Sequence, residues 1–256
     1  MIFDPPTSRP DALREAPLTL AAAECQLGLR ATLPALTNHL QEAAGLHAHA
    51  LGVGIETLQQ TGFTWMLSRL ALRLHRLPCW REALTLSTWP SGTRGRLAAE
   101  RQFVLESASG ERLLEASSEW LYVDFVHTQL ARLPATVAAL AHPGTLNFGL
   151  CAGKLPALPE GATPLATRPF AVRRSEIDAN GHVNNVHYTE WMFETVPEAL
   201  YFQGTPERLD IEYRQAARLG EEVLVRTWAL AATRFLHTVS RADGQLLARA
   251  LTQWRA

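Results

Sequence analysis

The chain of 256 residues repeats itself, and this repeat constrains its fold more than any other feature. Trp89 falls on Trp228 at an offset of 139 residues, inside two runs of alternating apolar and polar residues. Trp120 falls on Trp254 at the shorter offset of 134 residues (120 to 254). Alternating strands resemble one another by chance, which is the competing explanation. Two tryptophans at matching places in each copy favour a true repeat, so we expect two equivalent modules in tandem.

Both copies have the same order of elements. A helix with one apolar stripe comes first, and strands that alternate apolar and polar residues follow it. Gly110 and Gly244 each end a two-residue turn between two strand runs, which predicts antiparallel pairing. A helix with one apolar stripe buries that stripe against a sheet, so each module is an α+β unit. The predicted helices are Leu36 to His47 and Tyr188 to Ala199, and the strands before them are Leu18 to Leu29 and Arg168 to Arg174.

The stretch between the two copies is rich in Ala, Pro and Gly and has the composition of a connection. We therefore predict an N-terminal module at residues 1–133, a linker at residues 134–167 and a C-terminal module at residues 168–256. A single helix-on-sheet module has open sheet edges that usually need a partner. Two fused modules supply that partner within one chain.

Composition excludes several classes of function. The formal net charge is -1, so the chain lacks the basic excess of a general nucleic-acid binder. Three widely spaced cysteines, Cys25, Cys79 and Cys151, argue against a disulfide framework or a zinc ribbon. No stretch approaches the roughly 20 apolar residues that span a bilayer, and the N-terminus has no basic flank followed by an apolar core. We expect a cytoplasmic protein without membrane insertion.

The segment before the second helix carries the most chemistry. Asp178, Asn180 and His182 alternate by two, and in an extended or loosely turned segment this spacing directs all three side chains to one side. Asn184 or Asn185 is a good N-cap for the helix, whose first N–H groups favour negative charge. Hydrolysis of a thioester needs a group that takes a proton from water and donors that hold an oxyanion. This group of residues offers both.

Two other interpretations of the segment remain open. The D-x-N-x-H pattern is also that of a turn with Asx-type hydrogen bonds followed by a helix cap. Asp, Asn and His can all bind a metal, but no further set of ligands accompanies them. The first copy has no such group before its own helix, where the chain reads LRATLPALT from Leu29 to Thr37. A requirement of the fold would appear in both copies, so the asymmetry favours a functional role.

The run DANGHVNNVHYTEWMFETVP, residues 178–197, resembles the signature of the acyl-ACP thioesterase family of plants and bacteria. The resemblance extends from about Leu18 to Trp254. Four shorter motifs support it: NHLQEAA at 38–44, WMLSR at 65–69, TWP at 88–90 and SSEW at 117–120. It implies a double hot-dog fold, no cofactor, and release of free fatty acid from acyl carrier protein (ACP). From the residues themselves we expect no metal.

The resemblance also implies roles for individual residues. Asn180 and His182 are expected to polarise the thioester and assist proton transfer, while Asp178 orients or activates them. The first module is expected to hold much of the acyl tunnel. We further expect six residues to contact the substrate: Asn184, Asn185 and Trp65, and, as a basic rim for the acidic ACP, Arg173, Arg174 and Arg214.

One position departs from the family. There, the strand that reads E-Y-R is followed by an acidic residue and, in plant members, by Cys, whereas this chain has Ala216 and Ala217. Glu212 lies about 13 Å back along the strand and is not expected to replace that acid. Alternatives to acyl-ACP hydrolysis are an acyl-CoA thioesterase, a hot-dog enoyl hydratase and a non-catalytic acyl-chain or ACP-binding module. The acyl chain length stays open, as does the choice between monomer and homodimer.

Overall fold

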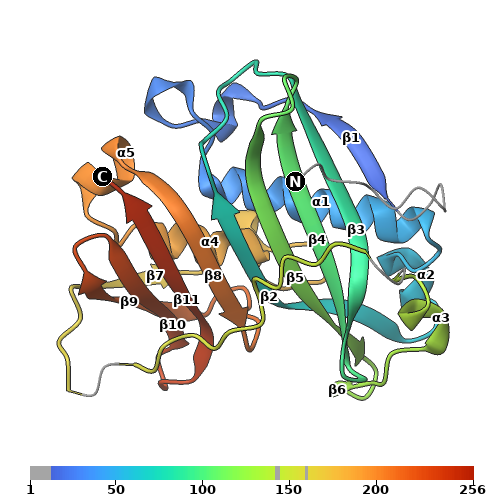
Figure 1. The fold of residues 1–256 in the computed structure, drawn as a ribbon. Helices are drawn as coiled ribbons and strands as arrows, with labels where there is room; N and C mark the ends of the chain where they lie inside the picture. The colour runs from blue at the N-terminus through green and yellow to red at the C-terminus, as the bar shows by residue number, and fades with distance from the viewer. Residues whose placement is uncertain (1–12, 142–144, 159–160) are drawn as a thin grey trace.

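The described strands of the chain form one curved antiparallel sheet, with the helices on one of its faces (Figure 1). The computed structural model describes residues 13–141, 145–158 and 161–256. Within these residues the sheet has 11 strands, in the order β1-β3-β4-β5-β2-β8-β11-β10-β9-β7, with β6 paired to β5. The predicted α+β architecture of helices on an antiparallel sheet is therefore confirmed.

Each half of the sheet contains one copy of the repeat. We call β1 to β6 with α1 to α3 the first module, and β7 to β11 with α4 and α5 the second. The first comprises β1 (Arg14–Leu18), α1 (Leu33–Ala50), α2 (Ile55–Gln59), β2 (Phe63–Leu74), β3 (Leu84–Arg94), β4 (Ala98–Ser107), β5 (Arg112–Asp124), β6 (Gln129–Leu130) and α3 (Ala135–Ala138). The second comprises β7 (Ala166–Ala171), α4 (Asn185–Phe193), α5 (Glu198–Gln203), β8 (Thr205–Tyr213), β9 (Glu222–Ala231), β10 (Arg234–Arg241) and β11 (Leu246–Arg255).

The two modules meet at β2 and β8, which pair antiparallel along Arg69–Arg73 and Arg208–Glu212. Ala71 faces Asp210 across this junction, and Asp210 is also the residue that the repeat offset of 139 assigns to Ala71. A residue that faces its own equivalent lies on a twofold axis. An approximate twofold axis therefore passes between these two residues and relates the modules, as the palindromic strand order requires.

A buried ion pair fixes this junction. The guanidinium of Arg69 on β2 donates from Nε to Oδ1 and from Nη2 to Oδ2 of Asp210 on β8, both over 3.0 Å. Nη1 of Arg69 also donates to the Cys151 carbonyl over 2.9 Å. Both charged side chains are less than one-tenth exposed. Removal of one partner leaves an uncompensated buried charge, so the pair ties the modules and the connecting segment together.

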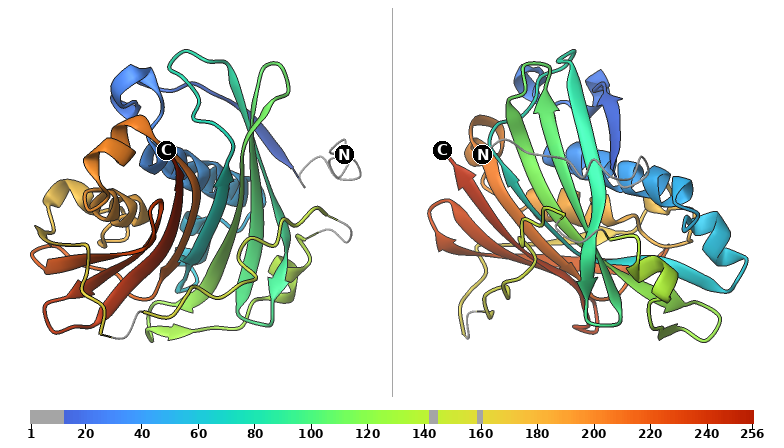
Figure 2. Two further views of the ribbon diagram at one scale, coloured as in Figure 1. Left: turned by 60° about the vertical axis from the view of Figure 1, so that its left-hand side comes forward. Right: turned by 45° about the vertical axis from the view of Figure 1, so that its right-hand side comes forward.

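The connection between the modules crosses the outer face of the sheet, opposite the helices (Figures 1 and 2). Trp89 is completely buried there, and its indole nitrogen donates to the Leu146 carbonyl over 2.9 Å. The 1–133, 134–167 and 168–256 boundaries stay predictions. Residues 1–12 of that N-terminal module lie outside the described residues, as do linker residues 142–144 and 159–160.

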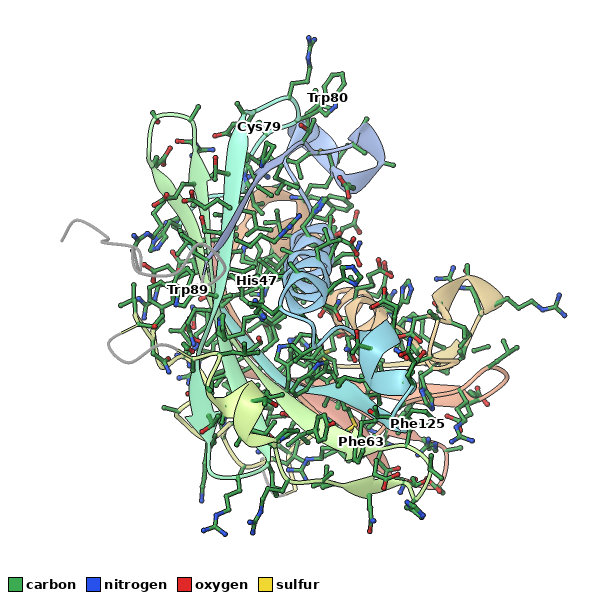
Figure 3. All side chains as sticks on the ribbon, turned by 90° about the vertical axis from the view of Figure 1, so that its right-hand side faces the viewer. His47, Phe63, Cys79, Trp80, Trp89 and Phe125 are labelled. Atoms are coloured by element: carbon green, nitrogen blue, oxygen red, sulfur yellow. The ribbon has the colours of Figure 1, made fainter. Side chains whose placement is uncertain are left out.

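Helix α1 lies where the first apolar stripe predicts it. Thr32 caps its N-terminus by accepting a hydrogen bond from the Ala35 backbone nitrogen over 3.2 Å. The predicted stripe is confirmed as the buried face, which contributes Leu36, Leu40, Ala43, Ala44 and His47. Figure 3 looks along this helix and shows His47 on its sheet-facing side.

Three element predictions need correction. The second helix ends at Phe193 and a short helix follows Pro197, because the proline ring cannot continue a helix. The predicted strand from Leu18 to Leu29 is wrong: β1 ends at Leu18 and two short 3₁₀ turns follow. Gly28 has a φ of 78°, which no strand allows. The second predicted strand begins and ends earlier, at β7. No helix of the described residues is long and apolar enough to cross a membrane.

Candidate active site

The predicted site residues lie on one tight loop between β7 and α4. We call residues 178–182 the DANGH loop. Ile177 and Val183 close it by an isolated β-bridge, and the Asp178 backbone nitrogen donates to the His182 carbonyl over 2.8 Å. Gly181 has a φ of 75°, a conformation that favours glycine. The chain therefore reverses within five residues and brings both ends of the motif together.

The carboxylate of Asp178 folds this loop. Its Oδ1 accepts the backbone N–H of Asn180 over 2.8 Å and that of His182 over 3.4 Å. This is the Asx-type turn that the sequence left open as an alternative. Of the two conformations that the spacing allowed, extended or loosely turned, the structure has the turned one.

The side chains of Asn180 and His182 remain available to a ligand. Asn180 is exposed, and His182 is half-buried. Among the described residues, the His182 ring has no hydrogen-bond partner, and the Asp178 carboxylate makes no hydrogen bond to it. The imidazole thus lies on a hydrogen-bonded loop with both ring nitrogens open for proton transfer.

A buried carboxylate anchors the loop from below. Glu176 is 1% exposed and accepts hydrogen bonds from the Arg173 backbone, the Arg173 guanidinium and the Trp191 indole, over 2.7 to 3.2 Å. Burial alone would raise the pKa of Glu176, but these hydrogen bonds and the arginine charge hold it below its ordinary value. The Asn184 backbone nitrogen donates to the Glu176 carbonyl over 2.9 Å, so the loop is fastened at both ends.

Helix α4 begins directly after the loop. Asn184 is its N-cap, and its side chain accepts a hydrogen bond from the Val186 nitrogen over 3.1 Å, as the sequence predicted for this pair of asparagines. Asn185 is the first helical residue, and its carbonyl accepts a hydrogen bond from the Tyr213 hydroxyl over 3.3 Å. The N–H groups of this first turn present partial positive charge beside His182, which suits a developing oxyanion.

The position of the missing acid lies beside the DANGH loop. The Val183 nitrogen donates to the Ala217 carbonyl over 3.0 Å, and Arg241 donates to the Ala216 carbonyl over 2.7 Å. Glu212 on β8 instead accepts a hydrogen bond from Arg249 on the neighbouring strand β11 over 2.8 Å. It therefore belongs to the junction network and does not take the place of an acid at Ala216.

The predicted basic rim is uneven. The Arg173 guanidinium forms an ion pair with Glu176. Nη2 of Arg214 lies 3.7 Å from Oε2 of Glu212. Arg174 is exposed and has no ion-pair partner among the described residues. Arg218 is exposed on the segment after Ala217 and has none either within the described ranges. The sequence analysis missed Arg218 because only the pairing of Val183 with Ala217 brings its segment to the loop.

Trp65 lies apart from this loop. Its indole nitrogen donates to the Val53 carbonyl over 2.9 Å, and its ring packs edge-on against Tyr122. Both belong to a separate apolar cluster beside α2 and α3, the end of the first module where Figure 3 labels Phe63. The predicted contact of Trp65 with substrate stays a prediction.

The space between α1 and its sheet is filled by side chains. Leu36, Leu40 and Phe103 are each at most 2% exposed. Surface cavities of about 600 Å³ and about 390 Å³ lie elsewhere on the molecule, one at β2, β8 and β11 and the other at β9 and β10. Neither is lined by a residue of the DANGH loop. An acyl chain therefore enters the first module only if some of these side chains move.

Thiol chemistry finds little support at this site. Burial raises the pKa of the Cys151 thiol to about 12, and Cys151 lies on the connecting segment, where its thiol donates to the Ser117 carbonyl of β5. A protonated thiol is a poor nucleophile.

Among the described residues, no three His, Cys, Asp or Glu side chains group as a metal site.

Two family models match the chain. The acyl-ACP thioesterase N-terminal domain matches residues 18–140, and the acyl-ACP thioesterase C-terminal domain matches residues 162–256. Among curated proteins, oleoyl-acyl carrier protein thioesterase 1 of Arabidopsis thaliana is 25% identical over 88% of this chain and 71% of its own length. A palmitoyl-acyl carrier protein thioesterase of Cuphea hookeriana is 25% identical over 88% of this chain and 58% of its own length.

Solved structures share the fold over nearly the whole chain. A 12:0-ACP thioesterase from Umbellularia californica has a TM-score of 0.85 at 22% identity and covers 95% of this chain and 97% of its own. An acyl-ACP thioesterase from Bacteroides thetaiotaomicron has a TM-score of 0.83 at 24% identity, covering 96% and 98%. These likenesses confirm the double hot-dog fold.

Proposed function

Because this chain belongs to the acyl-ACP thioesterase family and hydrolyses fatty acyl-ACP to free fatty acid and ACP, we propose that the reaction takes place at the DANGH loop. His182 is the general base of this proposal, and Asn180 is a donor to the oxyanion. Asp178 is a positioning residue, because its carboxylate holds the backbone of both.

The proposed reaction has two steps. His182 takes a proton from water, and the water oxygen attacks the carbonyl carbon of the thioester. The resulting oxyanion accepts hydrogen bonds from the Asn180 amide and from the Asn185 backbone N–H at the start of α4, since the Val186 and His187 N–H groups already donate to Asn184. Collapse of this intermediate breaks the C–S bond, the carrier thiolate takes the proton from His182, and the fatty acid keeps the water oxygen.

The observation that carries the proposal is the unengaged ring of His182. The backbone of the loop is hydrogen-bonded at Asp178, Asn180, Gly181 and His182, whereas the ring has no partner among the described residues. A residue held this firmly, with its titratable group left open beside a helix N-terminus, is suited to proton transfer.

Steady-state assays on acyl-ACP, acyl-CoA and enoyl-CoA test the proposal. We expect His182→Ala to lower kcat on acyl-ACP by about 10²- to 10⁴-fold, the range of a general acid–base group. His127→Ala is the matched control, since His127 is an exposed histidine on the β5–β6 turn. Hydration of enoyl-CoA without thioester hydrolysis, or full activity of His182→Ala, would sink the proposal.

We further propose that the acyl chain lies between α1 and the sheet of the first module. Ala43 and Ala44 face the sheet there, and small side chains leave the most room for a ligand once their neighbours move. Ala43→Leu should shift the preferred substrate to shorter acyl-ACP, with Ala50→Leu on the exposed end of α1 as the control. An unchanged chain-length profile would contradict this placement.

The carrier-protein contact is proposed for the rim formed by Arg174, Arg214 and Arg218. ACP is acidic, so exposed cations beside the loop raise the rate of encounter. The quaternary state is proposed as monomer or homodimer, which light scattering distinguishes. The cytoplasmic location, like the lack of nucleic-acid binding, rests on the sequence alone and stays a prediction.

A further inference from the structure

A side chain of the first module reaches the helix that follows the DANGH loop. Gln41 lies in the middle of α1, more than 140 residues before α4 in the chain. Its Nε2 donates to Oδ1 of Asn184 over 3.4 Å, and its Oε1 accepts a hydrogen bond from Nδ2 of Asn185 over 3.2 Å. Among the described residues, these are the only side-chain hydrogen bonds between α1 and α4 with its N-cap. The contact spans the two modules.

The donor and acceptor roles in this cluster are fixed by chemistry. The Val186 backbone N–H can only donate, so the Asn184 atom that faces it is the oxygen. The Gln41 atom beside that oxygen must then be its amide nitrogen, which leaves the Gln41 oxygen to accept from Asn185. One orientation of all three amides satisfies every hydrogen bond, so the cluster has a single preferred geometry.

The cluster controls the place where the loop joins the helix. Asn184 is two residues after His182, caps α4 and donates its backbone N–H to the Glu176 carbonyl. A shift of the Asn184 side chain therefore moves the end of the DANGH loop and the first N–H groups of α4 together. The Asn185 N–H, which is assigned to the oxyanion above, is one of these groups.

We infer that Gln41 is a positioning residue supplied by the first module, which sets the N-terminus of α4 and the His182 loop relative to α1. This inference rests on the proposed function of the loop. The active site is then complete only across the module junction, since the second module supplies the reacting groups and the first fixes their orientation.

Gln41→Met removes both hydrogen bonds and keeps the length of the side chain. We expect kcat on acyl-ACP to fall about 10-fold, the effect of losing one to two net hydrogen bonds. KM should stay within about twofold and the melting temperature within about 3 °C, because α1 stays anchored by its buried apolar stripe. Gln59→Met, the same change at an exposed position of α2, is the control and should leave kcat unchanged.

A double-mutant cycle separates positioning from general loss of structure. If Gln41 acts through Asn185, then Gln41→Met with Asn185→Leu should lower kcat no further than the more severe single change. Additive losses in kcat, or a Gln41→Met enzyme with wild-type kcat, would overturn the inference. His182→Ala distinguishes a failure of the proposed active site from a failure of the role of Gln41. If His182→Ala keeps its activity, the proposed active site is wrong. If His182→Ala is inactive and Gln41→Met keeps the wild-type kcat, only the role of Gln41 is wrong.

Discussion

The most informative single position is Asp178. Its carboxylate accepts hydrogen bonds from the backbone of Asn180 and His182 and not from the imidazole of His182. Asp178→Asn keeps an oxygen that can accept the Asn180 N–H, whereas Asp178→Ala removes it. The two variants therefore separate the folding of the loop from the negative charge of the carboxylate.

The size of the effect follows from the two hydrogen bonds. A hydrogen bond to a charged acceptor contributes about 1.5–3 kcal/mol when sheltered, and the 2.8 Å bond to Asn180 is of this kind. The 3.4 Å contact with the His182 N–H adds little. Asn180 is exposed, so its freed N–H finds water and the net loss in Asp178→Ala is about 1–2 kcal/mol.

If this free energy keeps the loop in its reactive shape, kcat of Asp178→Ala falls about 5- to 30-fold, at 1.4 kcal/mol per factor of ten. Asp178→Asn retains a neutral hydrogen bond and should lose about threefold. Initial rates of fatty acid release from acyl-ACP, with melting temperatures of both variants, measure this. The reasoning is refuted if Asp178→Asn is as inactive as Asp178→Ala, since the charge and not the turn would then be essential.

Three further predictions concern stability and docking. Burial lowers the pKa of His237 to about 3, whereas the same side chain in the unfolded protein has a pKa near 6.5. Between these two pH values, His237 is neutral in the folded protein and protonated in the unfolded protein. Stability should therefore fall by about 1.4 kcal/mol per pH unit from about pH 6 down to about pH 3, and denaturant titrations of His237→Gln should show this slope reduced. Arg69→Met should cost about 3–5 kcal/mol in urea unfolding, and the added change Asp210→Leu should restore much of it; an equal loss in the double variant would contradict a buried-charge origin. Arg218→Glu should raise KM for acyl-ACP several-fold at low salt but not in about 0.5 M NaCl, because dissolved ions screen the attraction between exposed charges. Arg132→Glu, at an exposed arginine of the first module, should leave KM unchanged at both salt concentrations.

The repeat and the identity of the loop could be predicted from the sequence because both depend on local patterns. Matching tryptophans located β3 with β9 and β5 with β11, and the apolar stripe from Leu36 to His47 located the buried face of α1. The strand predicted from Leu18 to Leu29 failed because Gly28 turns the chain there, and Leu27 and Leu29 are 68% and 51% exposed. Hydrophobic residues alone did not reveal that they face solvent.

The geometry of the site depended on contacts that no local pattern contains. The spacing of Asp178, Asn180 and His182 is compatible with an extended segment and with a turn, and only the hydrogen bonds of Asp178 decide between them. The contact of Gln41 with Asn184 joins residues 143 positions apart, so the sequence gives no sign of it. Local propensity identifies candidates, whereas tertiary contacts fix their roles.

The central claim is that the imidazole of His182 moves the proton in thioester hydrolysis. Chemical rescue tests it directly: His182→Gly is assayed for fatty acid release from acyl-ACP with and without added imidazole. We expect the variant to lose at least about 10² in kcat and to recover part of this loss as imidazole is added, while the wild-type enzyme does not respond. A His182→Gly enzyme that hydrolyses acyl-ACP at the wild-type rate without imidazole would contradict the account.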